Sequence, residues 1–201
     1  MTAIDAADDR QPDGSQHTDS RTKILHATVD LLLENGLAAT RTRAVTERSG
    51  VGTGLLNHYF RWNDLRAAAW KLIFDEVAKD SFPSSLPPDQ AMDRYFAGAF
   101  VPAAERFWRL WLEATELAKQ DEAIARVLAE AQTRMDGALC STLGAGNAAG
   151  LWALADPQAT AIRLGALYDG LAGLLLSGSG RLTRGAAEQH LRHLFALECK
   201  G

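Results

Sequence analysis

The stretch Arg41 to Phe60, RTRAVTERSGVGTGLLNHYF, decides the fold of this chain, because it has the pattern of two short helices joined by a tight turn. Ser49-Gly50-Val51 supplies the turn. The second helix has only about seven residues, so it is too short to form a core of its own, and its polar side chains are left facing outward. The apolar contacts of the pair come from Val45, Val51, Leu56 and Phe60.

The second of these helices has a buried side and a polar side. Leu56 and Phe60 are four positions apart and share the buried side, which turns Asn57 and His58 away from it. Together with the threonine and the tyrosine nearby, these outward residues are suited to contacts with phosphates and base edges. This is the layout of a helix-turn-helix whose second helix enters the DNA major groove. The pattern therefore predicts DNA binding.

A longer stretch around these helices, GLAATRTRAVTERSGVGTGLLNHYF from Gly36 to Phe60, resembles the DNA-binding segment of the TetR family of bacterial transcriptional regulators. The family pattern opens with a glycine and a Thr-Thr pair, for which this chain has Gly36 and Thr40-Arg41. Ser49-Gly50-Val51 stands for the family's Ala-Gly-Val turn, and His58-Tyr59-Phe60 for its aromatic end. The spacing from the glycine to the turn matches without a gap.

The resemblance implies a set of DNA contacts on the two helices. Arg43 and the first residues of the second helix are expected at base edges, where Arg pairs with guanine and Asn with adenine. His58 and Tyr59 are expected at phosphates, with Thr42 assisting, and such contacts set the register without reading sequence. The expected DNA-binding set is Thr42, Arg43, Thr53, Gly54, Leu55, Asn57, His58 and Tyr59.

Several positions depart from the family pattern, among them Arg41 in place of the second Thr and Asn57 in place of a common Tyr. Leu55 stands where the family usually has a small polar residue, so it either contacts a thymine methyl in the groove or faces inward and adds to the core. Asn63 stands where the family usually has a Lys, so Arg61 or Arg66 would have to supply that phosphate contact. These departures keep an alternative open, namely a helical dimeric small-molecule-binding protein with a degenerate DNA-binding head.

The distribution of charge also favours nucleic acid as the partner of the motif. The net charge of the 201 residues is −4, but the first twenty residues alone carry −4 and residues 36–66 carry +3. The basic segment is the one expected to face DNA, with an affinity that falls as salt rises. Residues 1–19 are polar and acidic with almost no apolar content, so we expect a disordered acidic tail.

Other function classes find little support in the sequence. No run approaches the ~18 apolar residues that cross a bilayer, and the N-terminus is not a signal peptide, so we expect a cytoplasmic protein without a membrane partner. Glu113 and Glu116 lie three positions apart, as paired catalytic carboxylates do, but we interpret them as a solvated helix face. His190 and His193 have a metal-ligand spacing without further ligands. We therefore expect no enzyme, no cofactor and no metal.

The apolar periodicity is helical throughout, which predicts an all-α fold with an N-terminal three-helix helix-turn-helix head and a C-terminal helical ligand-binding and dimerisation domain. A first helix should begin at Asp19 or Ser20, and the DNA-binding domain should span residues 20–80, with its motif at 41–60. Three prolines at 81–90 mark the boundary, and residues 88–201 form the second domain. In that domain the glycine-rich GAGNAAG, residues 144–150, is expected to be a loop after a helix that ends near Leu143.

The second domain is similar to the BetI-type, choline-responsive branch of the same family. Tyr168-Asp169-Gly170-Leu171 matches that branch's Ile-Asp-Gly-Leu, and Phe107-Trp108 matches its Phe-Trp. Effector pockets in such bundles form between helices, and aromatic faces with Glu113 or Asp169 would suit a cation. The expected effector pocket is lined by Phe96, Phe107, Trp108, Trp111, Trp152 and Tyr168.

The helix from Ala159 to Leu176 is nearly apolar throughout, which calls for more burial than one subunit provides. By resemblance, this helix and the last one (about 157–177 and 183–199) form a four-helix interface in a homodimer. Two-fold symmetry then implies a palindromic operator in double-stranded DNA. We therefore expect a ligand-responsive regulator, a repressor that an unknown small-molecule effector releases from its operator.

Overall fold

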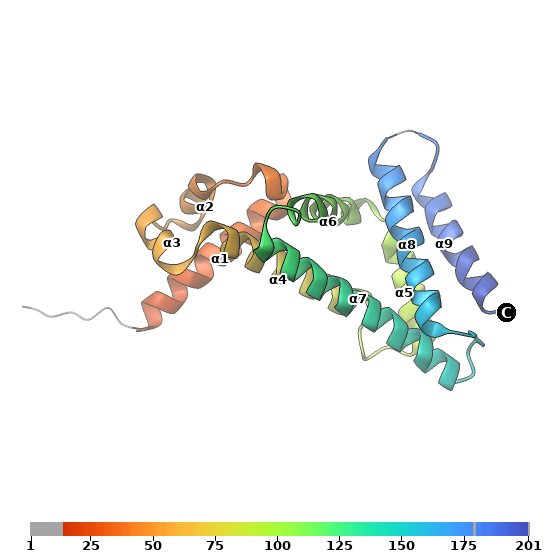
Figure 1. Cartoon of the computed structure of the whole chain (residues 1–201). Helices are drawn as coiled ribbons and strands as arrows, with labels where there is room; N and C mark the ends of the chain where they lie inside the picture. Colours follow the sequence, from red (N-terminus) through yellow and green to blue (C-terminus); the bar gives the residue numbers. More distant parts are fainter. Residues whose placement is uncertain (1–13, 179, 201) are drawn as a thin grey trace, which may run out of the picture.

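The computed structural model describes residues 14–178 and 180–200, and every regular element in those ranges is helical, as predicted (Figure 1). The molecule is elongated, with α1 to α3 at one end and α8 and α9 at the other. The helices are α1 (Gly14–Ala39), α2 (Thr42–Ser49), α3 (Thr53–Tyr59), α4 (Trp62–Ser81), α5 (Pro88–Ala99), α6 (Glu105–Leu117), α7 (Glu122–Ala148), α8 (Pro157–Leu176) and α9 (Arg184–Glu198), with a short 3-10 turn η1 (Pro102–Ala104) before α6.

The first helix is longer than the sequence pattern predicts. It begins at Gly14, so residues 14–19 of the expected disordered tail are helical, while the rest of that tail lies outside the described residues. Its regular part ends at Gly36, which has φ 83°, a left-handed conformation that favours glycine. One further turn, residues 37–39, leads to α2. The helix thus changes direction just before the helix-turn-helix.

Three clusters of buried side chains run along the molecule. The cluster at the head is built from α1, α2, α3 and the start of α4, and includes the fully buried Ile24, Val45 and Leu56. The middle cluster joins α1 and α4 to α6 and α7 around Trp70, whose indole Nε1 donates to the carbonyl of Leu110 at 3.1 Å. The helices expected to belong to the DNA-binding domain therefore share a core with the second domain.

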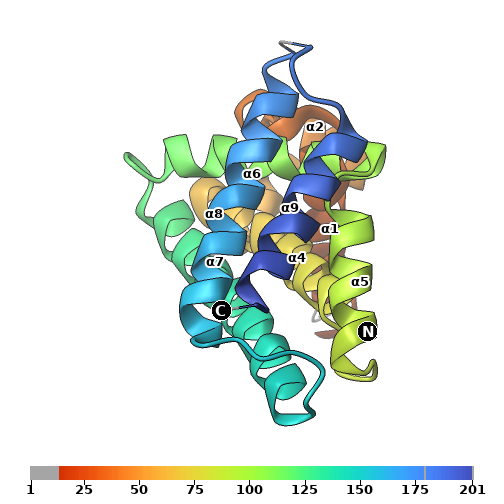
Figure 2. The same cartoon turned by 90° about the vertical axis from the view of Figure 1, so that its right-hand side faces the viewer.

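The third cluster joins α5 to α9, with α8 and α9 lying side by side as the outer layer (Figure 2). Asp156 accepts from the amide of Ala159 at 3.0 Å and Thr183 from that of Ala186 at 3.1 Å, so both caps occupy the predicted helix starts. Contrary to the sequence-based expectation, α8 is long and apolar enough by composition to cross a membrane, and only 28% of that window is buried. Its outer face is left uncovered.

Residues 144–148 of the expected loop are helical instead, because α7 continues to Ala148, and only residues 149–150 form a turn. Gly146 is buried under Trp152, and a Cβ at this position would lie 1.8 Å from the indole ring. The Trp152 Nε1 donates to the carbonyl of Leu143 at 2.8 Å, and the Asn147 side chain bonds the backbone of Leu154 at 2.8 and 2.9 Å. This glycine serves close packing and not flexibility.

The substitution Gly146→Ala should lower the stability of the protein by about 1–3 kcal/mol, because the added methyl displaces Trp152 and its hydrogen bond. Gly144→Ala is the matched control on the same helix, since its Cβ would meet nothing within 4 Å. It should gain about 0.5–1 kcal/mol from helix propensity. Thermal unfolding followed by circular dichroism measures both changes. An increase in Tm for both variants would contradict the packing role.

Candidate DNA-contacting face and effector cavity

The two helices of the motif pack as the pattern predicts. Val45 on α2 and Leu56 on α3 are fully buried, and Phe60 after α3 is nearly so. Gly50 closes α2 with φ 67°, a left-handed conformation that a non-glycine residue rarely adopts. The tight turn therefore depends on glycine, and it sets α3 at the extremity of the head (Figure 1).

One side of α3 is open to solvent. Thr53, Gly54, Leu55, Asn57 and His58 are all exposed. Leu55 is 38% exposed and lies outside the head's buried cluster, so the structure has the outward orientation of the two that the sequence allowed. The other expected contacts sit at the edge of this face: Thr42 and Tyr59 are half-buried, and the Tyr59 ring meets that of His58 edge-on, at 5.2 Å between centroids.

The arginines around the motif differ in how firmly acidic side chains of the protein bind them, and so in how readily they can bind a phosphate. The side chain of Arg43 is 88% exposed and pairs with Glu47 on its own helix at 2.7 Å, which raises the pKa of the guanidinium. Arg48 is bound in two places to Glu34 of α1, at 2.9 and 2.8 Å. These pairs lie in solvent, where an ion pair contributes little and exchanges readily for a phosphate.

Arg66 does not reach the DNA-contacting side. Its guanidinium is buried against Asp121, with 3.0 Å between Nη2 and Oδ2, and its Nε is buried without a hydrogen-bond partner. Asp121 is itself the N-cap of α7 and accepts from Ala123 at 3.0 Å and Ile124 at 3.3 Å. Of the two arginines that could replace the missing lysine contact, Arg61 alone remains exposed.

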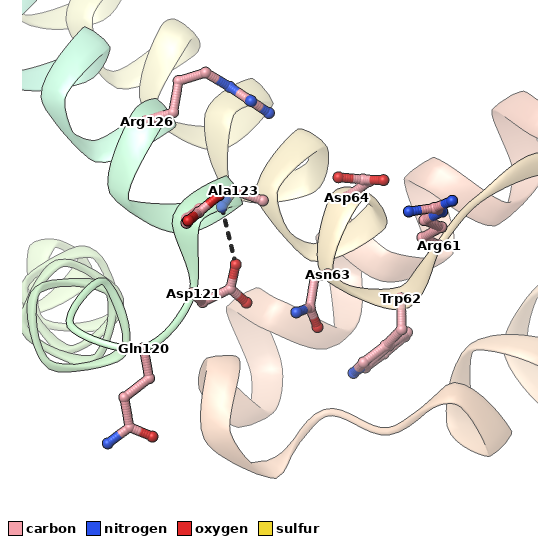
Figure 3. A pocket seen from close by; sticks show the side chains of 9 residues that line it. Arg61, Trp62, Asn63, Asp64, Gln120, Asp121, Ala123 and Arg126 are labelled. Atoms are coloured by element: carbon pink, nitrogen blue, oxygen red, sulfur yellow. Dashed lines mark hydrogen bonds between the residues drawn. The ribbon is translucent and has the colours of Figure 1, made fainter.

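A polar hollow of about 470 Å³ lies beside this buried pair, between the start of α4 and the start of α7 (Figure 3). Arg61, Trp62 and Asn63 line it from α4, and Gln120 and Arg126 line it from the other side. The dashed line in Figure 3 is the Asp121 cap. At this hollow the start of α4 packs against α7, which belongs to the body of the molecule, the helices α5 to α9.

A larger cavity, of about 1100 Å³, lies within the body between α4, α5, α6, α7 and α8. Four of the six aromatic residues expected to line an effector pocket do so: Phe107, Trp108, Trp111 and Tyr168. Phe96 and Trp152 do not. Phe96 is 3% exposed in the core, under the guanidinium of Arg192, and Trp152 is held over Gly146.

Most of the charged side chains that line the cavity are acidic, namely Asp80, Asp136 and Asp169 against Arg94. Tyr168 accepts from the indole Nε1 of Trp108 at 2.8 Å, and burial raises the pKa of Tyr168 to about 12. Asp169 lines the cavity and remains open to solvent, and its pKa is raised by burial and then by the negative charge of Asp136. Arg94 also lines the cavity, but its Nε donates to the carbonyl of Asp80. An apolar wall with three carboxylates and one arginine favours a positively charged occupant.

Sequence reasoning missed Asp136. Its signal is weak, because a lone acidic residue on a long helix also fits a solvated face. Glu113, which the sequence offered both as a solvated residue and as a cation ligand, is neither: it does not line the cavity, and its carboxylate binds the amides of Leu37 and Ala38. In the described ranges, no group of three or more His, Cys, Asp or Glu side chains could hold a metal ion.

Comparison with known families gives two matches that together cover most of the chain. Residues 24–62 match the profile described as bacterial regulatory proteins of the tetR family, and residues 88–200 match that of the C-terminal domain of BetI-type transcriptional repressors. No curated protein gives a significant match.

Solved structures share the fold over nearly the whole chain. A protein from Rhodococcus sp. described as a TetR-family transcriptional regulator has 24% identity and a TM-score of 0.73, covering 90% of this chain and 99% of its own. A transcriptional regulator from Saccharomonospora viridis in complex with choline has 19% identity and a TM-score of 0.75, over 89% and 96%. One from Pseudomonas aeruginosa PAO1 has 22% and 0.70, over 95% and 94%.

These regulators are not enzymes, in agreement with the sequence-based expectation. The second profile alone matches more than half of the chain. With its helix-turn-helix head and its helical body, the chain belongs to the TetR family of transcriptional regulators and has a C-terminal domain of the BetI type.

Proposed function

We propose that this protein is a homodimeric repressor that binds a palindromic operator and is released from it by a small organic cation. The observation that carries the proposal is the pairing of two surfaces in one chain: an exposed recognition side on α3, and a cavity in the body that shares α4 with the head. Both surfaces are needed for a switch, because an effector acts only through different affinities for two states. Such a protein works in the cytoplasm, where the DNA is.

Base reading is assigned to the exposed side of α3. Asn57 is exposed and four residues from the N-terminus of the helix, and Arg43 extends from α2 with its guanidinium in solvent. Both carry the fork geometry that pairs with adenine or guanine in the major groove. Thr42, His58 and Tyr59 flank this set and are assigned to phosphates.

Asn57→Ala should lower affinity for the operator by about 1–3 kcal/mol and leave random duplex binding nearly unchanged, because an amide that reads a base edge contributes only at its cognate site. The operator is first selected from a random duplex pool with the wild-type protein, and affinities are then measured by fluorescence anisotropy. Equal losses on both DNAs would contradict base reading. A degenerate head would instead fail to bind heparin or random duplex even at low salt.

The dimer interface is assigned to the outer faces of α8 and α9. Ile162, Ala166, Gly170 and Leu174 follow one another at intervals of four on α8, and all are exposed, Ile162 to 58% and Leu174 to 51%. Leu197 on the neighbouring α9 is 52% exposed. Apolar residues in such a continuous band call for a cover, and a second copy covers both helices at once. Dimerisation therefore explains the membrane-like composition of α8.

Ile162→Glu should give a folded monomer with operator binding largely lost, because the charge lies in the interface and half a palindrome forfeits most of the affinity. Leu171→Glu, on the same helix, is the contrasting control. Leu171 is 6% exposed within the core of one subunit, so this variant should unfold. Size-exclusion chromatography with circular dichroism separates the two outcomes. A wild-type protein that is monomeric at micromolar concentration would overturn the assignment.

The effector is assigned to the class of small organic cations. The cavity offers the faces of Phe107 and Trp111 and the carboxylates of Asp136 and Asp169. The pKa of Asp169 is raised because partial burial and the charge of Asp136 disfavour its negative charge, and a bound cation would relieve that penalty. The structural neighbour from Saccharomonospora viridis holds choline. The cavity volume of about 1100 Å³ exceeds the volume of choline, so larger cations of the same class also fit.

Choline should raise the Tm of the protein and weaken operator binding, whereas its neutral isostere 3,3-dimethylbutan-1-ol should do neither, because only the charge distinguishes the two. Asp169→Asn should reduce the choline effect by about tenfold or more while keeping the fold. Thermal shift and anisotropy assays report both effects. Equal responses to the two compounds would contradict a cation site, and equal responses of wild type and Asp169→Asn would remove Asp169 from it.

A further inference from the structure

The helix α6 (Glu105–Leu117) lies between the cavity and the head. Trp108, Trp111, Leu112 and Thr115 line the cavity from this helix. Glu113 projects from the opposite side, because it lies one position from Leu112 and two from Trp111 and Thr115, which turns it away from this set on a helix. A shift of α6 caused by an occupant of the cavity is therefore carried directly to whatever Glu113 binds.

Glu113 binds the backbone of the head. Its Oε2 accepts from the amide of Leu37 at 2.5 Å and from that of Ala38 at 3.2 Å. These are the first two amides after the kink in α1 at Gly36, and amides at the start of a helical turn commonly need an acceptor from outside it. A carboxylate is the strongest acceptor for such amides, and the contact spans 76 positions in sequence.

The space for the carboxylate depends on Gly36. A Cβ at this position would lie 2.6 Å from one Glu113 oxygen and 2.8 Å from the other, so any larger residue would displace the carboxylate. A glycine is therefore needed at position 36 for two reasons: its left-handed φ and the space that the Glu113 carboxylate occupies. These reasons explain the glycine that opens the sequence motif.

The turn held by Glu113 leads straight into α2. Thr40 is buried at 2% exposure and donates to the carbonyls of Gly36 at 2.7 Å and Leu31 at 3.2 Å, which fixes the turn to α1. Arg41 follows as the N-cap of α2. The chain between the carboxylate and the helix-turn-helix is therefore short, and hydrogen bonds hold it at Leu37, Ala38 and Thr40.

We propose that Glu113 is a positioning residue that transmits occupancy of the cavity to the helix-turn-helix through the amides of Leu37 and Ala38. This inference rests on the proposed function and adds a route to it, distinct from the packing of α4 on α6 around Trp70. A movement of α6 by a fraction of an ångström lengthens or breaks a 2.5 Å contact, while the apolar contacts nearby tolerate it. The two hydrogen bonds to Glu113 thereby influence the orientation of α2 and α3 relative to the rest of the molecule.

The test needs neither DNA nor an effector, so its failure is distinct from failure of the proposed function. Gly165→Phe introduces a ring into the cavity from α8, where a Cβ meets nothing within 4 Å. Hydrogen exchange of the full-length protein, read on a peptide covering residues 33–40, reports on the Leu37 and Ala38 amides. The substitution is made in wild type, in Glu113→Ala and in the matched control Glu116→Ala, which removes an exposed α6 carboxylate that pairs with Lys119 just after the helix.

In wild type and in Glu116→Ala, Gly165→Phe should change the exchange rate of this peptide by about fivefold or more. In Glu113→Ala the exchange should already be fast and should not respond, while Glu113→Gln, which keeps a neutral acceptor, should recover part of the response. A purely structural role would leave the response intact in every background. A response of equal size in Glu113→Ala, or no response in wild type, would overturn the proposal.

Discussion

The structure depends on the burial of Trp70 between the head and the body. Its indole is fully buried, its ring stacks on Phe74, and its Nε1 is satisfied by the carbonyl of Leu110 on α6. A buried tryptophan whose N–H is hydrogen-bonded stabilises the fold through its large apolar area, and the hydrogen bond fixes the orientation of its ring. This contact makes one core out of two functional parts, so α4 belongs to the DNA-binding head and to the cavity wall at once.

The polar contacts between the head and the body act differently from the apolar contacts between them. Arg66 and Asp121 are both buried, and breaking such a pair leaves an uncompensated charge. Glu113 on the backbone of α1 has the same character. Apolar packing tolerates small slides of one helix on another, whereas these groups bond only in one register. These buried polar contacts therefore fix the register of the head on the body, and the proposed switch would have to change them.

The parts of the fold that follow from sequence are the local ones. The buried side of α3, the caps at Asp156 and Thr183 and the all-helical character each depend on residues within a few positions of one another. Contacts between distant segments were not predictable in this way. Gly146 was interpreted as part of a loop because its partner, Trp152, reaches it only when the chain turns back. Phe96 was assigned to the cavity because an aromatic residue in the core has the same local pattern.

Glu113 shows the same limit at the functional site. On its helix it has the pattern of a solvated residue, and only the kink at Gly36 brings the amides of Leu37 and Ala38 within reach of its carboxylate. The sequence contained both halves of this contact, an opening glycine and a lone glutamate, 77 positions apart. The physical link between them is the packing of α1 on α6, which in turn follows from the burial of Trp70 and Leu37 in one cluster. Apolar burial thus places the polar groups, and the polar groups then define which relative positions of head and body are allowed.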